Sequence, residues 1–219
     1  MKRVLLGSWR KIAFILAIVG SLLVLILLSF GIIFYSGGNY FNPSTPGYSM
    51  WLNTWSDLGR TVAWSGETNF TAQLFFSLAC VFWVISLVPS IHALQSLFSE
   101  SRLGKLLSNT GTLFALISAI TVFLFVFFFP EDLHPFPHRF FAVLGYFSFF
   151  LAEILYAYIM FNDKNYPNTH AIGFLAVGIV ILLFLIFNAA ILQKLVTFIH
   201  TIVIWIVFYS AVKSLQQNE

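Results

Sequence analysis

The sequence predicts an all-α protein that crosses a membrane six times as a helical bundle. Its 219 residues are 59% hydrophobic and only 9% charged, and 27 of them are phenylalanines. This composition is typical of polytopic membrane proteins, because a soluble core of this size needs far less apolar surface. The apolar residues also fall into six runs, each long enough to cross the hydrocarbon layer as a helix. We therefore expect a single six-span membrane domain over residues 1–219.

The six apolar runs are separated by short polar turns, except for one long loop. We expect membrane spans at residues 12–35, 70–97, 106–129, 139–161, 171–192 and 195–212. Pro89 should kink the second span or end it early, and Pro137 suits the first position of the fourth. Gln193 and Lys194 are expected to form a tight turn before the last span.

The basic residues predict how the bundle is oriented. Of the eleven Lys and Arg residues, Arg60, Arg139 and Lys194 fall on one side of the membrane, which leaves eight for the side that carries both termini. Because basic residues favour the cytosolic side, we expect both termini in the cytosol and the protein in the plasma membrane. The net charge of +3 is scattered over membrane flanks without a basic stripe, so nucleic-acid binding is not expected.

The long loop over residues 36–69 is expected to be structured and to lie outside the cell. Trp51, Trp55, Leu58 and Val62 recur at helical spacing, and Ser49 precedes them as a candidate cap. This pattern predicts a short amphipathic helix at the membrane interface, with its indole rings at the lipid boundary. The same loop also carries polar residues that suit a lid or part of a site.

Polar residues recur at one depth near the outer ends of several spans. Gln73, His138, Asn188 and His200 come from four different spans. Because polar groups inside a membrane usually face the bundle interior, they predict a pocket that opens outward beneath the loops. The expected pocket residues are Ser56, Asp57, Arg60, Glu131, Asp132, His134, His138, Arg139, Asn188 and His200.

Three interpretations of this pocket remain open. Polar side chains can bridge membrane helices and serve structure alone. Alternatively, His134, His138, His200 and Asp57 offer nitrogen and oxygen ligands of the kind that zinc prefers. The prolines between His134 and His138 exclude the helical spacing of an H-E-x-x-H site, however. A third interpretation is recognition of a lipid headgroup or small polar ligand by the arginines and carboxylates.

Glu153 is a separate candidate, because it lies in the middle of the fourth span. A charged carboxylate there is unfavourable, so we expect it to be protonated or hydrogen-bonded. Ser118 and Thr121 lie at a similar depth and are its expected partners. An intramembrane carboxylate of this kind also suits a proton site in a small transporter.

Two segments resemble a family of six-helix membrane proteins of bacteria and archaea that is known only as a domain of unknown function. They are NTWSDLGRT in the first loop and FPEDLHPFPHRFFA between the third and fourth spans. That family is similar in layout to the eukaryotic DRAM/Sfk/FRAG-like membrane proteins. Its first motif is matched by Ser56, Asp57, Leu58 and Gly59. Its second is matched by Phe129, Pro130 and either His138 or His134.

The resemblance implies six helices and a polar outer face, and it implies no reaction. A more distant similarity is to the membrane hydrolases that include alkaline ceramidases, which use Ser, Asp and three His near the membrane surface. In this chain His200 stands alone in the last span.

The leading functional hypothesis is a non-enzymatic membrane protein that senses or organises lipids or a membrane partner through its outer pocket. Membrane lipids, a membrane-protein partner or a second copy are the expected partners, and no cofactor is expected. The alternatives are a metal-dependent lipid hydrolase, with zinc held near Asp57, His138 and His200, and a small proton-coupled transporter that uses Glu153.

Overall fold

A computed structural model describes residues 2–98 and 101–217, and it confirms an all-α bundle with six helices that are long and apolar enough to span a membrane. The six long helices are α1 (Lys2–Ile33), α3 (Phe70–Gln95), α4 (Arg102–Phe128), α5 (Pro135–Asn162), α6 (Asn168–Phe187) and α7 (Ala190–Gln217). Two short helices complete the described part of the chain: α2 (Trp55–Leu58) lies in the long loop, and η1 (Ser96–Phe98) follows α3.

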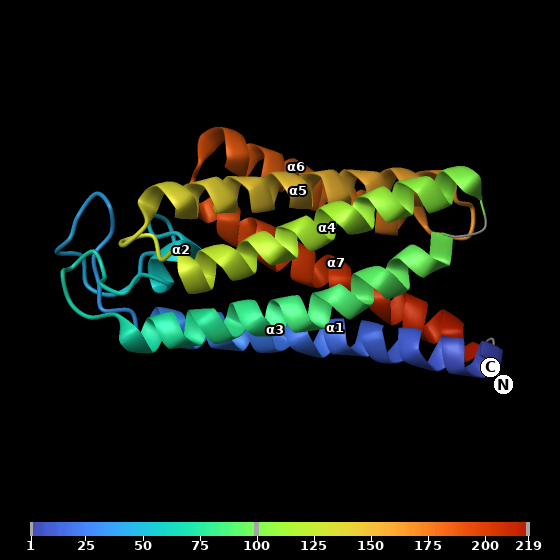
Figure 1. Cartoon of the computed structure of the whole chain (residues 1–219), viewed down its shortest axis with the longest axis horizontal. Coiled ribbons are helices and arrows are strands. Elements are labelled where there is room, and N and C mark those ends of the chain that lie inside the picture. Colours follow the sequence, from blue (N-terminus) through green and yellow to red (C-terminus); the bar gives the residue numbers. More distant parts are fainter. Residues whose placement is uncertain (1, 99–100, 218–219) are drawn as a thin grey trace.

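The six long helices form a closed ring. Along the chain each long helix packs against the next, and α7 returns to pack against α1. Figure 1 shows both termini at one end of the bundle and α2 with its loop at the other. The two ends therefore differ in kind: one carries the termini, and the other carries the structured loop.

The outer surface of the bundle is apolar on every long helix. Ile12, Ile85, Leu106, Ile120 and Ile186 are all more than half exposed. Large apolar side chains that point away from the protein suit a lipid environment, where the backbone must satisfy its own hydrogen bonds inside helices. This outward face is what the apolar composition of the chain predicts.

The second span continues through Pro89 and does not end there. Pro89 lies inside α3, although it has no N–H to donate to the preceding turn. Figure 1 shows that the second half of α3 rises away from α1 toward α4. The hydroxyls of Ser86 and Ser90 donate to the carbonyls of Trp83 and Leu87, 3.1 and 2.7 Å away. The carbonyl that Pro89 leaves without its usual donor is that of Ile85, four residues earlier, and packing against neighbouring helices makes such a proline tolerable in a membrane helix.

The last turn of the bundle was predicted at the wrong place. α6 ends at Phe187, and Asn188 adopts a left-handed conformation with φ 48° and ψ 32° before α7 begins at Ala190. Asparagine is one of the few residues that adopt this conformation readily, so it can end a helix as glycine does. As a result Gln193 and Lys194 lie in the first turns of α7 instead of in a turn.

The fourth span also begins earlier than predicted. Pro135, and not Pro137, is the first residue of α5. Its missing N–H is harmless there, because the first N–H groups of a helix have no intrahelical partner. His138 consequently lies one turn inside the helix rather than at its head.

The buried core consists of two separate clusters. One cluster lies toward the loop and includes Val24, Trp55 and Phe76. The other extends toward the termini and includes Phe149 and Ile204. Residues of both clusters line the cavity described below, so the cavity lies where the two parts of the core meet.

Candidate functional site

The helix in the long loop is a single turn that is folded into the protein. α2 covers only Trp55–Leu58, with Thr54 as its N-cap and Asp57 completing a capping box. Trp55 is 6% exposed, whereas Trp51 lies outside the helix and is 70% exposed. The predicted amphipathic surface helix is therefore wrong. Gly59 follows at once, and a Cβ there would lie 2.7 Å from the ring of Phe76, so the chain passes too close to α3 for a side chain at this position.

Asp57 is buried at the centre of this loop and holds it together. Its carboxylate accepts hydrogen bonds from Asn53 Nδ2 at 3.0 Å, Thr54 N at 2.8 Å and Trp64 Nε1 at 2.7 Å. The guanidinium of nearby Arg60 lies 3.9 Å from the centre of the Trp64 ring, a cation–π contact. Because its oxygens already have donors, Asp57 is placed to support the loop.

Buried asparagines connect distant parts of the same loop. Asn69 donates through Nδ2 to the carbonyls of Leu58 and Arg60, both at 3.1 Å. Asn53 donates through Nδ2 to the carbonyl of Gly38 at 3.0 Å. Both side chains are at most 1% exposed. A buried backbone carbonyl needs such a partner, so these residues replace the regular secondary structure that the loop lacks.

The turn between α4 and α5 is attached to the long loop through Asp132. Its carboxylate accepts from the backbone N–H groups of Thr61 and Val62, at 3.1 and 3.0 Å, and from the Thr61 hydroxyl. Partial burial acts to raise the pKa of Asp132, but these hydrogen bonds outweigh it and hold the pKa below its ordinary value. For neighbouring Glu131, burial first and the charge of Asp57 second raise the pKa to about 7.

Three side chains of α7 attach α2 to the bundle. Trp55 donates from its backbone N to Gln193 Oε1 at 2.6 Å and from Nε1 to Thr197 Oγ1 at 3.0 Å. Lys194 is 1% exposed and donates to the backbone carbonyl of Asn53. Its Nζ also lies 5.1 Å from the ring centre of Tyr48. We name these contacts the α2–α7 latch.

Sequence reasoning missed this latch, although a signal was present. Gln193, Thr197, His200 and Thr201 recur at the spacing of one helix face along the last span. The pattern becomes visible only if the last span is taken to begin before Gln193. The turn was placed at Gln193 and Lys194 instead, which separated them from the polar face.

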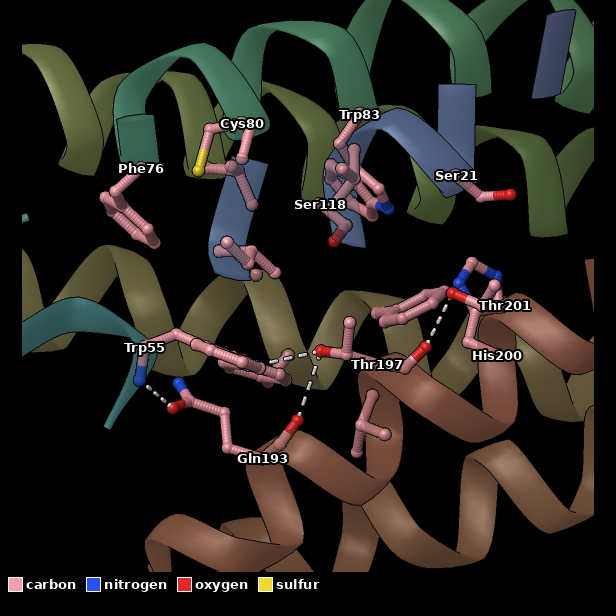
Figure 2. Close-up of a pocket in the computed structure, with 18 of the residues that line it drawn as sticks. Ser21, Trp55, Phe76, Cys80, Trp83, Ser118, Gln193, Thr197, His200 and Thr201 are labelled. Carbon is pink, nitrogen blue, oxygen red and sulfur yellow. Dashed lines mark hydrogen bonds between the residues drawn. The ribbon is translucent and has the colours of Figure 1, made fainter. Parts of the chain in front are cut away.

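A cavity of about 130 Å³ lies beneath the latch, inside the ring of helices. Trp55 and Ser56 of α2 cover it, and α1, α3, α4, α5 and α7 form its walls. Most of the wall is apolar, with Ala79, Val122, Ala142 and Phe149 among the lining residues. Figure 2 shows Phe76, Cys80 and Trp83 of α3 among the side chains that line it. A largely apolar pocket with a few polar groups is the usual form of a small-molecule site.

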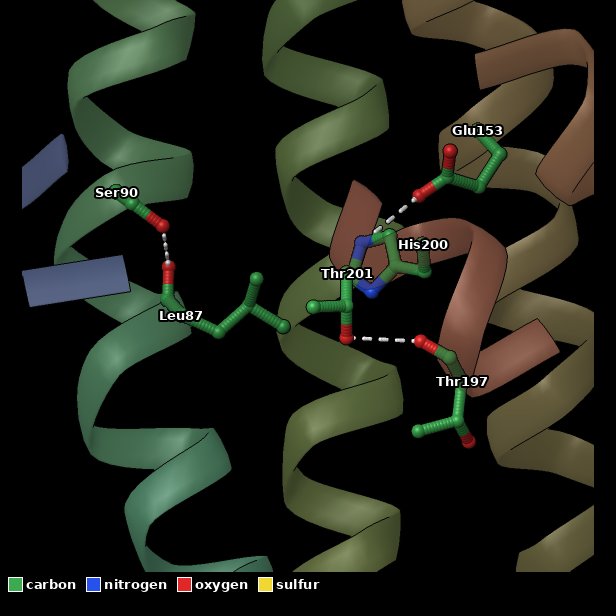
Figure 3. A network of polar contacts seen from close by, with 6 residues as sticks. All are labelled: Leu87, Ser90, Glu153, Thr197, His200 and Thr201. Carbon is green, nitrogen blue, oxygen red and sulfur yellow. Dashed lines mark hydrogen bonds and ion pairs between the residues drawn. The ribbon is translucent and has the colours of Figure 1, made fainter. Parts of the chain in front are cut away.

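A buried acid–base pair lies at the end of the cavity farther from α2. His200 lines the cavity, and its Nε2 lies 3.6 Å from Oε1 of Glu153 (Figure 3). The two residues are 7% and 3% exposed. Glu153 is thus neither isolated nor bonded to the expected Ser118 and Thr121, since the Thr121 hydroxyl donates to the Ser118 carbonyl. Among the described residues, Oε2 of Glu153 has no hydrogen-bond partner.

The structure separates the predicted pocket residues into three groups. Ser56 and His200 line the cavity. His138 is buried apart from them, with Nδ1 2.8 Å from the carbonyl of Phe129. The remaining residues lie in the loops or are exposed at the loop end: Asp57, Arg60, Glu131, Asp132, His134, Arg139 and Asn188.

The candidate zinc ligands are not gathered. Among the described residues there is no group of three or more His, Cys, Asp or Glu side chains that could hold a metal ion. Asp57 is occupied by loop donors, His138 by a carbonyl contact, and His134 is exposed. The predicted combination of Asp57, His138 and His200 therefore does not form one site.

Comparison of the chain with protein-family models, with curated proteins and with solved structures found no match. The resemblance based on the loop motifs therefore stays a prediction. Within this fold, Ser56, Asp57, Leu58 and Gly59 form or follow the single turn of α2, and this position explains why a capping carboxylate and a glycine are needed there.

Proposed function

We propose that this integral membrane protein binds a lipophilic molecule, such as a lipid chain, in the cavity beneath α2. The observation that carries the proposal is the cavity itself, a largely apolar space lined by five long helices and by Trp55 of α2. Apolar surface favours an apolar occupant, and each buried CH₂ group contributes about 0.8 kcal/mol. The protein is then a lipid-sensing or lipid-organising component of the membrane.

This proposal keeps lipids as the partner but moves the binding site from the outer loops into the bundle. The carboxylates of Asp57 and Asp132 already accept several hydrogen bonds within the protein. They have little capacity left for a ligand, whereas the cavity offers a largely apolar lining. We further propose that the loop end faces the outside of the cell, because eight of eleven basic residues favour the opposite side as cytosolic.

Proton-coupled transport is the second candidate, and one observation favours it. His200 connects the cavity to Glu153 at 3.6 Å, so a proton site adjoins the proposed ligand site. Hydrolysis at a metal centre has less support, because its three candidate residues are held by separate partners.

Photolabelling tests the binding proposal. The protein in lipid nanodiscs is labelled with hexadecanol that carries a photoreactive diazirine, and labelled peptides are identified by mass spectrometry. We expect labelling of cavity residues that excess unlabelled hexadecanol displaces. Ala142→Phe fills the cavity and should lower this saturable labelling roughly tenfold or more, because several CH₂ groups lose their burial.

Val143→Phe is the matched control. Val143 adjoins Ala142 in α5 but is 51% exposed on the outer surface, so its substitution should leave saturable labelling unchanged. Labelling that is confined to outward-facing residues and is not displaced by excess hexadecanol would overturn the proposal.

A further inference from the structure

Some of the polar groups around His200 already form hydrogen bonds within the protein, and others do not. The hydroxyls of Thr197 and Thr201 donate to carbonyls one turn earlier in α7, at 3.3 and 2.9 Å. The hydroxyl of Ser21 donates to the Ile18 carbonyl at 2.9 Å. By contrast, Nδ1 of His200 has no hydrogen-bond partner within the part of the chain that the structure describes. This nitrogen, like the hydroxyls of Ser56 and Ser118 that also line the cavity, remains for an occupant, and it is the one fixed beside a carboxyl group.

The surroundings of His200 fix the direction of its ring. The ring lies with its plane nearly perpendicular to that of Phe149, with centres 4.8 Å apart, and Nε2 faces Glu153. The two ring nitrogens lie on different sides of the imidazole, so a ring that presents Nε2 to the carboxyl presents Nδ1 elsewhere. Because His200 lines the cavity, an occupant can reach this second nitrogen.

The protonation of the pair decides what Nδ1 can recognise. Two separated charges inside a bundle are unfavourable, and among the described residues no lysine or arginine forms an ion pair with Glu153. Of the two uncharged arrangements, one places the carboxyl proton on Oε2, where it would be a buried donor without a partner. The other places it on Oε1 facing Nε2, with the ring proton on Nδ1, and is favoured because an unpartnered acceptor costs less than an unpartnered donor. Nδ1 is then a hydrogen-bond donor directed to an acceptor on the ligand.

We infer that the cavity takes an uncharged amphiphile whose head carries a carbonyl oxygen, and that this oxygen accepts a hydrogen bond from Nδ1 of His200. This inference rests on the proposed function and adds the ligand's chemical class to it. Glu153 is a positioning residue, because its proton holds the imidazole in the tautomer that donates to the ligand. The separation of 3.6 Å is longer than a hydrogen bond, so the proposal requires the carboxyl to move closer to Nε2 when a ligand binds Nδ1.

Competition against the photoreactive hexadecanol separates the head of the ligand from its chain. The competitors are tridecane, 2-tridecanone and 2-aminotridecane, each expressed as a mole fraction of the nanodisc lipid. We expect 2-tridecanone to displace half of the label at a concentration roughly five to ten times lower than tridecane, as one neutral hydrogen bond predicts. The ammonium compound should compete no better than tridecane, since Nδ1 offers it no acceptor.

His200→Phe keeps a ring of similar shape but removes both nitrogens. In this variant we expect 2-tridecanone and tridecane to displace half of the label at the same concentration, while tridecane still competes. His200→Gln keeps an N–H donor and should retain part of the preference for 2-tridecanone over tridecane. The two variants together test the role of His200 even if one of them folds poorly. His92→Phe, at an exposed histidine of α3, should behave as the unchanged protein.

Infrared difference spectra test whether the Glu153 carboxyl is protonated and responds to the ligand, which a purely structural role of this residue would not predict. Adding 2-tridecanone should shift the band of a protonated carboxyl group, and Glu153→Gln should lack that band. Equal competition by 2-tridecanone and tridecane, with labelling still saturable, would overturn the inference and leave the binding proposal standing. Absence of saturable labelling would overturn the binding proposal itself.

Discussion

At the scale of single residues, the loop end of the protein depends on buried polar groups whose hydrogen bonds are made internally. Asp57 is 4% exposed and accepts from three donors, and Asn53 and Asn69 satisfy backbone carbonyls of a segment with little regular structure. Removing such a partner leaves a buried group unsatisfied, which costs about 1–3 kcal/mol. These residues therefore determine whether the loop can cover the cavity.

Glu131 is the exception, because its Oε2 is buried without a hydrogen-bond partner among the described residues. Its pKa is raised from 4.5 to about 7, so the folded protein binds this proton more tightly than the unfolded chain does. Between those two pH values the unfolded state binds fewer protons, and stability falls as the pH rises. We predict that Glu131→Gln removes this fall and stabilises the protein by about 1–3 kcal/mol above pH 7, since one pKa unit corresponds to about 1.4 kcal/mol.

Thermal unfolding of the detergent-solubilised protein across the pH range measures this effect. Glu67→Gln, at an exposed carboxylate of the same loop end, is the control and should leave the profile unchanged. An identical pH profile for Glu131→Gln and the unchanged protein would show that the carboxyl is not destabilised by folding.

At the scale of elements, α2 is held by α7 rather than by its own length. A single helical turn is unstable alone, because its nucleation is unfavourable. The latch supplies the Gln193, Thr197 and Lys194 contacts to Trp55 and Asn53. α2 and the first turns of α7 therefore form one cover over the cavity.

We predict that Lys194→Met loosens this cover without unfolding the bundle. The substitution keeps an unbranched side chain but removes the ammonium donor, so the Asn53 carbonyl keeps only the Tyr48 hydroxyl at 3.2 Å, at a cost of about 1–3 kcal/mol. Amide hydrogen exchange should become faster in residues 49–58 and stay unchanged in α4 and α5. Lys213→Met, at an exposed position late in the same helix, is the matched control. Unchanged exchange in residues 49–58 would contradict the role assigned to the latch.

The elements also differ in how well the sequence predicts them. The six spans were predictable, because each is a long apolar run that only a helix can carry through a membrane. The turn at Asn188 was missed, because one left-handed residue ends α6 without a break in hydrophobicity. The extent of α2 was missed because helical spacing alone does not reveal that Thr54 and Gly59 limit it to one turn.

At the scale of the whole molecule, the site depends on which helices face each other across the ring. Glu153 and His200 lie on α5 and α7. Their contact depends on the order of the helices around the ring and on which side of each helix faces inward, and neither can be read from a single sequence. Sequence reasoning found both residues but assigned them to different sites, one to a pocket and the other to an isolated carboxylate. It also located the polar loop residues, whose internal hydrogen bonds only the three-dimensional arrangement reveals.

We have proposed that the space between the helices binds a lipophilic molecule. Native mass spectrometry of the protein, extracted from its membrane in a mild detergent, is the most direct test of this binding. We expect a bound molecule that stays with the protein and with Val143→Phe, and that is absent from Ala142→Phe. Equal retention of the bound molecule in all three proteins would place it on the outer surface and overturn the proposed cavity site.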